Sequence, residues 1–146
     1  MADHLVPAQR SRNMREIRQK DTKPEVLVRK LTHRMGYRFR LHSKGLPGKP
    51  DLVFPWRKKI IFVHGCFWHG HKCSGGHIPK SHVQYWSQKL RGNKKRDAAN
   101  NRKLRALGWR TLIIWECQTE NAEKLKIHIQ RFLDRKWESK RKPKLI

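Results

Sequence analysis

Apolar side chains recur at helical spacing in three segments of the chain. The first is 22–35, where Pro24 suits the first turn of a helix and Gly36 ends the pattern. The other two are 82–107 and 121–137. Their apolar positions are Leu27, Val28, Leu31 and Met35; Trp86, Leu90, Leu104 and Leu107; and Leu125, Ile129, Phe132 and Leu133. The pattern therefore predicts three helices, each with an apolar face.

Shorter apolar runs between these helices predict β-strands. Residues 37–41 alternate between apolar and polar, and the runs 51–54 and 59–64 are separated only by a turn. Residues 109–115 are the most strand-like run in the chain. The resulting order of helix, strands, helix, strand and helix predicts an α/β domain with a mixed sheet flanked by helices.

Polar and basic residues frame this region. Residues 1–20 form a basic arm, in whose second half Met14 and Ile17 are the only sizeable apolar residues, and residues 139–146 form a basic tail. A chain of 146 residues with 36% hydrophobic side chains can bury one core. We therefore expect a single domain over 21–138.

The balance of charge indicates the class of partner. Lysine and arginine number 36 against 11 acidic residues, a formal net charge of +25, which indicates a polyanion and first of all nucleic acid. A ribosomal-type or merely solvated basic surface is the alternative on charge alone, because charge gives affinity without chemistry. The chain has no run of roughly 20 apolar residues and no apolar signal region at its start, so we expect an intracellular, cytoplasmic protein.

All three cysteines fall into one candidate metal set, Cys66, His71, Cys73 and Cys117. Tetrahedral zinc takes thiolates and imidazole, and a short loop closed by a distant cysteine is typical of a structural zinc site. Three uncoordinated thiols are the alternative, and an odd number of cysteines fits a reducing compartment. His69 lies inside the loop but out of step with the ligands, which leaves it for other work.

Asp51 follows Pro50 at the head of a buried strand, an arrangement that resembles the metal-binding half of restriction-endonuclease-like nucleases. The acidic residue and lysine that usually follow on the second strand are replaced here by Phe62-Val63-His64. Mg²⁺ prefers oxygen ligands, so Asp51, a main-chain carbonyl near Val63 and phosphate oxygens could hold it. The pair alone carries little weight, because an aspartate after proline usually just opens a turn.

Several motifs together resemble the very short patch repair (Vsr) DNA mismatch endonuclease family. They are Asn13-Met14-Arg15, Pro50-Asp51, the run from Phe62 to Cys73, Leu107-Gly108-Trp109-Arg110 and Trp115-Glu116-Cys117. The resemblance implies a restriction-endonuclease-like fold and a Mg²⁺-dependent nickase. Such an enzyme cuts the strand carrying the T of a T:G mismatch on the 5′ side of that thymine, which initiates repair of deaminated 5-methylcytosine.

The resemblance also implies roles for individual residues. Asp51 would bind catalytic Mg²⁺, and His64 and His69 would lie beside the scissile phosphate. His69 is the candidate general base, because imidazole can take a proton from water near neutral pH. Glu25 would orient an imidazole or a metal-bound water. Asp97 is a weaker candidate for such support, since a surface ion pair on a basic helix would explain it equally well.

Large apolar side chains are implied to recognise the mismatch. The family uses Phe67, Trp68 and Trp86 as a wedge stacked into the duplex, and Met14 and Ile17 match apolar residues inserted from the other groove. For Trp86, a place in the core is the alternative. The implied partner is double-stranded DNA with a T:G mismatch, bound by a monomer that also contacts mismatch-repair proteins.

Two other functions compete with mismatch nicking. A zinc-stabilised nucleic-acid-binding protein without catalysis would keep the cysteine and histidine set but would not need Asp51, His64 and His69 to converge. A restriction-type nuclease for an undamaged site would keep the catalytic residues but would have no use for the aromatic wedge.

Overall fold

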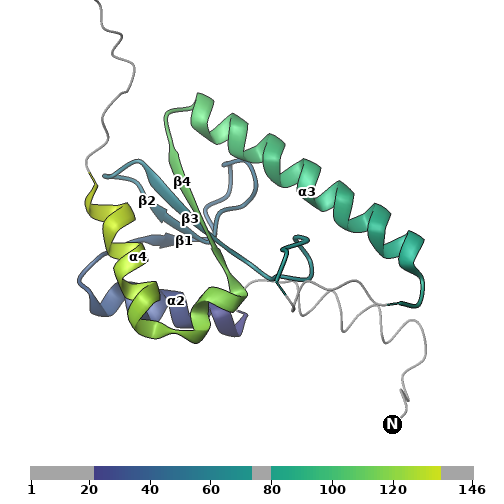
Figure 1. Cartoon of the computed structure of the whole chain (residues 1–146). Coiled ribbons are helices and arrows are strands. Elements are labelled where there is room, and N and C mark those ends of the chain that lie inside the picture. The colour runs from purple at the N-terminus through teal and green to yellow at the C-terminus, as the bar shows by residue number, and fades with distance from the viewer. Residues whose placement is uncertain (1–21, 74–79, 136–146) are drawn as a thin grey trace, which may run out of the picture.

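The computed structural model of the chain describes residues 22–73 and 80–135. The elements in these ranges follow the predicted order (Figure 1). They are α2 (Lys23–Arg34), β1 (Arg40–Leu41), β2 (Leu52–Phe54), β3 (Lys59–His64), α3 (Val83–Ala106), β4 (Arg110–Trp115), the 3-10 helix η2 (Glu116–Glu120) and α4 (Ala122–Asp134).

The four strands form one mixed sheet in the order β1-β2-β3-β4. The first three strands pair antiparallel, whereas β3 and β4 pair parallel through the crossover helix α3. In that parallel pair Lys59 lies opposite Arg110 and His64 opposite Trp115. The carboxyl ends of β3 and β4 therefore meet at one edge of the sheet, and the chain leaves both strands there.

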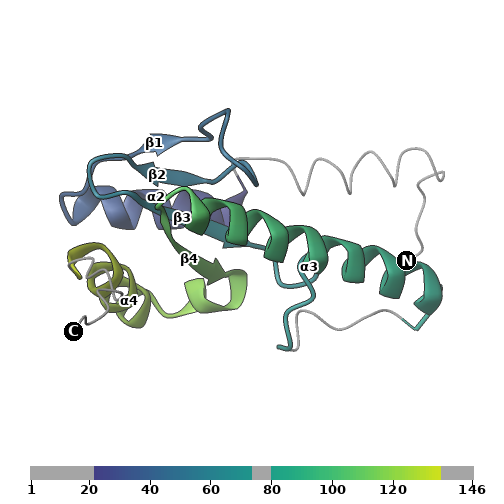
Figure 2. The ribbon, with the colours of Figure 1, turned by 90° about the horizontal axis from the view of Figure 1, so that it is seen from above.

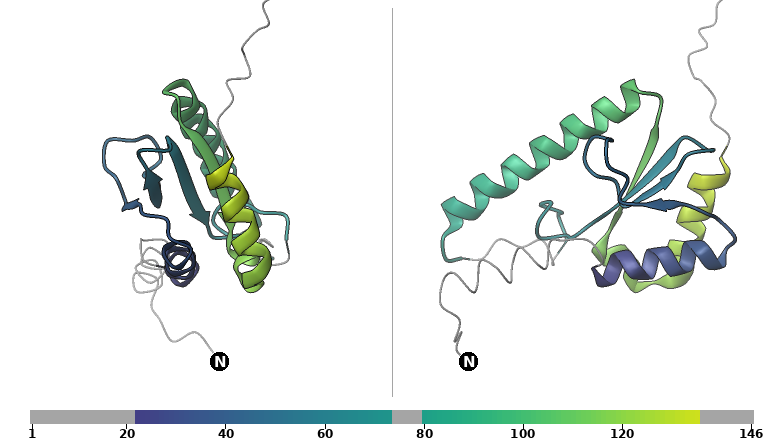
Figure 3. Two further views of the ribbon diagram at one scale, coloured as in Figure 1. Left: turned by 90° about the vertical axis from the view of Figure 1, so that its left-hand side faces the viewer. Right: turned by 180° about the vertical axis from the view of Figure 1, so that it is seen from behind.

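Helices cover both faces of the sheet. Helices α2 and α4 pack on one face, and α3 lies on the other, as the right-hand view of Figure 3 makes clear. The first core contains Val28, Leu52, Phe54, Ile61, Ile114, Leu125, Ile129 and Leu133; the second contains Val53, Ile60, Phe62 and Leu104. Successive residues of β2 and β3 alternate between the two cores, because strand side chains point to opposite faces in turn.

Local signals in the sequence place the first helix. The Thr22 side chain accepts a hydrogen bond from the Glu25 backbone N–H at 3.4 Å, and Gly36 follows the helix in a left-handed conformation with φ of +98°. Glu25 consequently lies in the first turn of α2 and is buried.

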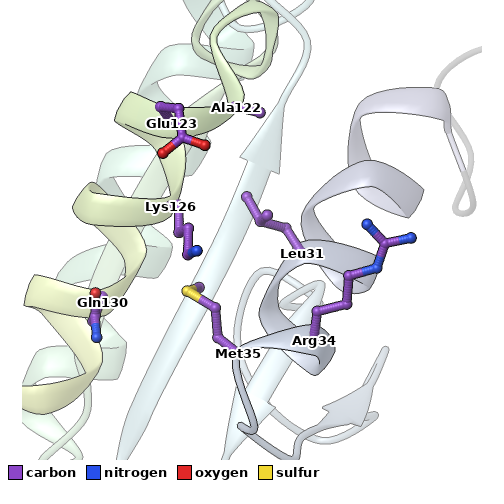
Figure 4. A pocket seen from close by; sticks show the side chains of 7 residues that line it. All are labelled: Leu31, Arg34, Met35, Ala122, Glu123, Lys126 and Gln130. Atoms are coloured by element: carbon purple, nitrogen blue, oxygen red, sulfur yellow. The ribbon is translucent and has the colours of Figure 1, made fainter.

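Helices α2 and α4 leave a shallow groove between them on their outer side (Figure 4). It has a volume of about 490 Å³, and its lining residues are Leu31, Arg34, Met35, Ala122, Glu123, Lys126 and Gln130. None of the clustered histidines, cysteines or buried carboxylates described below contributes to this lining, so the groove is separate from the candidate active site.

The predicted α/β class and element order are confirmed, with one boundary corrected. Strand β1 covers only Arg40–Leu41 instead of 37–41, because it pairs with just two residues of the short β2, and Tyr37 packs into the core instead. The arm 1–20 with Met14 and Ile17, the tail 139–146 and the expected helix end at 136–137 lie outside the described residues. Within the described ranges, the helices do not combine the length and apolar character needed to cross a membrane.

Lys59 ties the start of β3 to the end of α4. Its buried ammonium donates to the carbonyls of Phe132 at 2.6 Å, Leu133 at 3.1 Å and Arg135 at 2.5 Å. Carbonyls at a helix C-terminus lack partners within the helix, and a cation there also opposes the helix dipole.

We expect Lys59→Met to lower the free energy of unfolding by about 2 kcal/mol, because several charge-assisted hydrogen bonds are lost at once. Urea denaturation measures this value. Lys124→Met, which removes the same side chain from the exposed first turn of α4, serves as the control and should change stability by less than about 0.5 kcal/mol. Equal effects of the two substitutions would contradict the assigned role.

Candidate active site

Two histidines and an aspartate meet at the carboxyl end of β3. His64 is the last residue of the strand, and its ring stacks on that of His69 with centroids 3.7 Å apart and planes 9° from parallel. His69 Nδ1 lies 2.5 Å from Asp97 Oδ2, which is carried by α3. An ionised carboxylate only accepts hydrogen bonds, so Nδ1 carries the proton and Nε2 of His69 keeps a lone pair. This arrangement suits a general base.

His64 is held in its neutral form. Burial first, and the neighbouring His69 second, lower the pKa of His64 to about 3, although Asp97 acts in the opposite direction. Its buried Nδ1 has no hydrogen-bond partner among the described residues. His69 is therefore stacked on an uncharged ring at neutral pH.

Two carboxyl groups, the buried one of Glu25 and the half-buried one of Asp51, approach each other near the end of β3. Asp51, just before β2, accepts a hydrogen bond at Oδ2 from the Val63 backbone N–H at 2.7 Å. Burial, and after it the charge of Glu25 and a hydrogen bond to Glu25, raise the pKa of Asp51 to about 7, against the opposing effects of the Val63 N–H and Arg29. A pair of buried carboxylates is stable only when a proton or a cation lies between them.

Two further side chains, Arg29 and His42, bind the Glu25 carboxylate. Oε2 of Glu25 accepts a hydrogen bond from Arg29 one helical turn later and lies 2.8 Å from His42 Nε2. His42 follows β1 with φ of +45°, and its backbone N–H donates to the Asp51 carbonyl at 3.3 Å. Oxygen atoms of Glu25 and Asp51 are thus collected in one place, which suits a hard divalent cation such as Mg²⁺.

The three thiols and His71 also converge. One possible ligand atom from each of Cys66, His71, Cys73 and Cys117 lies within 4.8 Å of the others, and Cys117 Sγ is 3.6 Å from His71 Nδ1. Ligands of a tetrahedral zinc ion are separated by about 3.8 Å, so the donor set and its spacing fit that ion. Burial raises the pKa of the Cys66 thiol to about 12, so a bound cation would be needed to keep it ionised.

Trp115 lies between the thiol cluster and the histidine pair. Its ring stacks on His71 at 4.1 Å and 14°, and it meets the edge of His64 at 5.3 Å and 78°. One aromatic side chain therefore contacts both groups.

Three aromatic rings gather on the loop after β3 and the start of α3. Phe67 lies 5.0 Å from Trp68 and 5.1 Å from Trp86, all in edge contacts, and the three rings are only half-buried. Asn93 of α3 donates to the Trp68 carbonyl at 2.8 Å, which fixes this loop on the helix. Figure 2 shows that the N-terminal half of α3, which carries Trp86, extends beyond the strands. The aromatic cluster therefore lies outside the two cores of the sheet.

Comparison with known proteins decides the family. A model of the family DNA mismatch endonuclease Vsr matches residues 2–75. A type II nicking enzyme of Xanthomonas oryzae pv. oryzae, V.XorIIP, is 48% identical over 134 residues, which cover 92% of this chain and 98% of that protein. The DNA mismatch endonuclease Vsr of Escherichia coli is 42% identical over 125 residues, which cover 86% of this chain and 80% of that protein.

The chain belongs to the DNA mismatch endonuclease Vsr family. The resemblance drawn from the sequence motifs is thereby confirmed. Vsr membership makes the chain a DNA endonuclease by family and implies a restriction-endonuclease-like fold, with which the four-stranded mixed sheet agrees. It also fits a basic chain whose partner is DNA.

In this Vsr member, the predicted site residues lie in two separate groups. Asp51 and Glu25 form one group, whereas His64 and His69 form another. The carboxylate on His69 is Asp97, which the sequence left undecided between support and a surface ion pair. The imidazole on Glu25 is that of His42.

Three residues of the site were not predicted from the sequence. His42 and Arg29 bind Glu25, and Asn93 holds the aromatic loop. Arg29 could have been found from its spacing of four residues from Glu25 on a predicted helix. A buried asparagine within a helix otherwise rich in lysine and arginine gives a weaker signal, and His42 lies where no periodic pattern continues.

The raised pKa of Asp51 means that its ionisation lowers the free energy of unfolding. The pKa of this carboxyl group is 3.8 in the unfolded chain and about 7 in the folded protein. Ionisation of Asp51 therefore lowers the free energy of unfolding progressively as pH rises from about 4 to 7, and this loss of stability is complete above pH 7.

Asp51→Asn keeps the oxygen that faces the Val63 N–H. Without added Mg²⁺, it should raise the free energy of unfolding by roughly 2 to 4 kcal/mol at pH 8.

Urea denaturation of Asp51→Asn and the parent at pH 5 and pH 8 measures this effect, and the advantage should shrink at pH 5. Glu120→Gln, which neutralises an exposed carboxylate, is the control and should show little change at either pH. A stability difference that does not vary with pH would contradict the assigned cause.

Proposed function

We propose that the chain nicks the thymine-containing strand of a T:G mismatch on the 5′ side of the thymine, and so begins repair of deaminated 5-methylcytosine. The observation that carries the catalytic part is the His69–Asp97 pair beside His64, next to the Asp51–Glu25 pair, in a chain of the Vsr family. A binding protein without catalysis would not need these two groups at one end of the sheet.

His69 is the proposed base. Asp97 accepts a hydrogen bond from the Nδ1–H of His69, which orients Nε2 toward the attacking water. The proton of the water passes to Nε2 as the water oxygen bonds to phosphorus; the bond from phosphorus to the oxygen of the leaving nucleotide breaks, and that oxygen takes a proton from solvent. His64 remains neutral, and its Nε2–H tautomer can donate to a phosphoryl oxygen while leaving the buried Nδ1 as an acceptor.

Asp51 and Glu25 are the proposed holders of Mg²⁺, with the main-chain carbonyl near Val63 and the substrate phosphate. Bound there, Mg²⁺ would neutralise charge that develops on the phosphoryl oxygens and the leaving group. The Val63 N–H fixes the Asp51 carboxylate, and Val63 immediately precedes His64. Asp51 and the histidine pair are thereby held to adjacent residues at the end of β3.

The aromatic cluster supports mismatch recognition. Phe67, Trp68 and Trp86 are half-buried rings that contact one another outside both cores, which suits insertion into a base stack. Separating stacked bases costs a few kcal/mol per step, and a mismatch lowers this cost because its stacking is already weakened. Met14 and Ile17 in the arm 1–20 are proposed to insert from the other groove.

The first test is nicking of labelled duplexes in the presence of Mg²⁺. One duplex carries T:G in a cytosine-methylation sequence, and the others carry T:A or C:G at the same position. We expect one nick, 5′ to the mismatched thymine, in the first duplex only. Asp51→Ala should reduce the rate at least about 1000-fold and Asp97→Asn about 10- to 100-fold, both with DNA binding retained.

The same assay can reject the proposal in two ways. Equal cutting of all three duplexes would indicate a restriction-type nuclease for an undamaged site. Tight binding without cutting, over a range of flanking sequences, would leave a nucleic-acid-binding protein. Lys124→Met, on an exposed turn of α4, provides the matched control for a variant that loses only surface charge.

We also propose that Cys66, His71, Cys73 and Cys117 hold a structural zinc ion. The protein should contain one zinc per chain by elemental analysis. Cys117→Ser and His71→Asn should lose it, and the melting temperature should fall by roughly 10 °C or more, since structural zinc contributes directly to folding. His128→Asn, which changes an exposed histidine on α4, should keep the full zinc content. Full zinc content in Cys117→Ser would exclude this ligand set.

A further inference from the structure

We infer that His42 and Arg29 are positioning residues for Glu25, and that a hydrogen-bond donor at position 42 sets how tightly the Asp51–Glu25 pair binds a divalent cation. This inference rests on the proposed function in one respect, namely that Asp51 and Glu25 hold the catalytic cation. It goes beyond it by assigning a task to two side chains that the proposed reaction does not otherwise use.

The contacts of Glu25 show how its carboxylate is fixed. Its side chain is only 3% exposed, so the carboxylate has lost most of its water. Arg29 and His42 Nε2 both bind the same oxygen, Oε2, the latter at 2.8 Å. Two donors on one oxygen of a buried carboxylate leave it little freedom to rotate. Glu25 is thereby held against Asp51 in a fixed orientation.

The backbone of His42 indicates that its side chain has a specific task. His42 has a φ of +45°, in the left-handed region where a side chain other than glycine or asparagine costs about 1 kcal/mol or more. Its own N–H donates to the Asp51 carbonyl at 3.3 Å while its ring binds Glu25. His42 thus connects the main chain of one carboxylate residue with the side chain of the other.

The same distances distinguish positioning from direct metal ligation. His42, Glu25 and Asp51 are close enough together to hold an ion, so the imidazole could in principle be a ligand. However, His42 Nε2 lies 3.1 Å from a guanidinium nitrogen of Arg29 as well as 2.8 Å from Glu25. A cation bound about 2.1 Å from Nε2 would have to sit beside that positive charge. The contact of Nε2 with Glu25 is the shorter one and needs a hydrogen on Nε2, because a carboxylate only accepts; the geometry therefore favours an Nε2–H that donates to Glu25, with Arg29 donating to Glu25 and not to the ring.

A matched pair of substitutions separates these roles. Glutamine and methionine have similar length and bear the same left-handed strain at position 42, but only glutamine can donate a hydrogen bond to Glu25. We expect His42→Gln to keep the dissociation constant for Mn²⁺ within about threefold of the parent. His42→Met should weaken binding about 10-fold or more, as loss of a residue that orients a metal ligand typically does.

The experiment measures Mn²⁺ binding to the full-length, zinc-loaded protein without DNA, by the electron paramagnetic resonance signal of free Mn²⁺. Thermal melts show whether each variant folds. Arg29→Met provides a second test and should also weaken binding about 10-fold. Lys30→Met, which removes an exposed positive charge from the next position of α2, is its control and should leave binding unchanged.

Two results would overturn the inference. Parent-like affinity in both His42→Met and Arg29→Met would show that Glu25 needs no such support. Equal weakening in His42→Gln and His42→Met would show that the imidazole itself is a ligand. Asp51→Ala must abolish the binding; if it does not, the proposed cation site is wrong and the inference fails with it. A parent that binds Mn²⁺ but never nicks a T:G duplex would overturn only the proposed substrate, because the binding constants decide the roles of His42 and Arg29.

Discussion

The parallel pairing of β3 with β4 is the constraint on which the rest of this structure depends. Because His64 lies opposite Trp115, the chain leaves both strands at the same edge of the sheet, and Cys66 and Cys117 follow within two residues. The crossover α3 returns past that edge and brings Asp97 to His69 and Trp86 to Phe67. A shift of one residue in this pairing would separate the thiols and turn His64 to the other face.

Several polar groups near the carboxyl end of β3 lower the stability of the fold. The half-buried carboxyl group of Asp51 contacts the buried one of Glu25, and His64 is an imidazole that burial keeps neutral. The surrounding backbone and side chains hold these groups: the Val63 N–H binds Asp51, Arg29 and His42 bind Glu25, and Asp97 binds His69. The far end of the sheet shows the opposite pattern, because there Lys59 satisfies three helix carbonyls and contributes to the fold.

The sequence predicted the architecture well, because the spacing of apolar residues and the residues that begin and end helices depend mainly on local structure. Thr22, Pro24 and Gly36 marked the first helix, and the run from Lys59 to His64 marked a strand that is buried on both faces. The convergence of Cys66 and Cys117 could be anticipated because ligand types are rare and their spacing is informative. Two features could not be predicted. β1 is short because its partner β2 is short, which is a property of another segment. His42 contacts Glu25 from a left-handed backbone conformation that no pattern in the sequence announces.

The ring of Trp115 has a consequence for how the two centres depend on each other. It stacks flat on His71 of the thiol cluster and meets His64 of the histidine pair edge-on. A change in the position of His71 therefore reaches His64 through a single rigid side chain, without any movement of the sheet. The thiol cluster thus helps to fix the ring of His64 as well as bringing together segments that are distant in the chain.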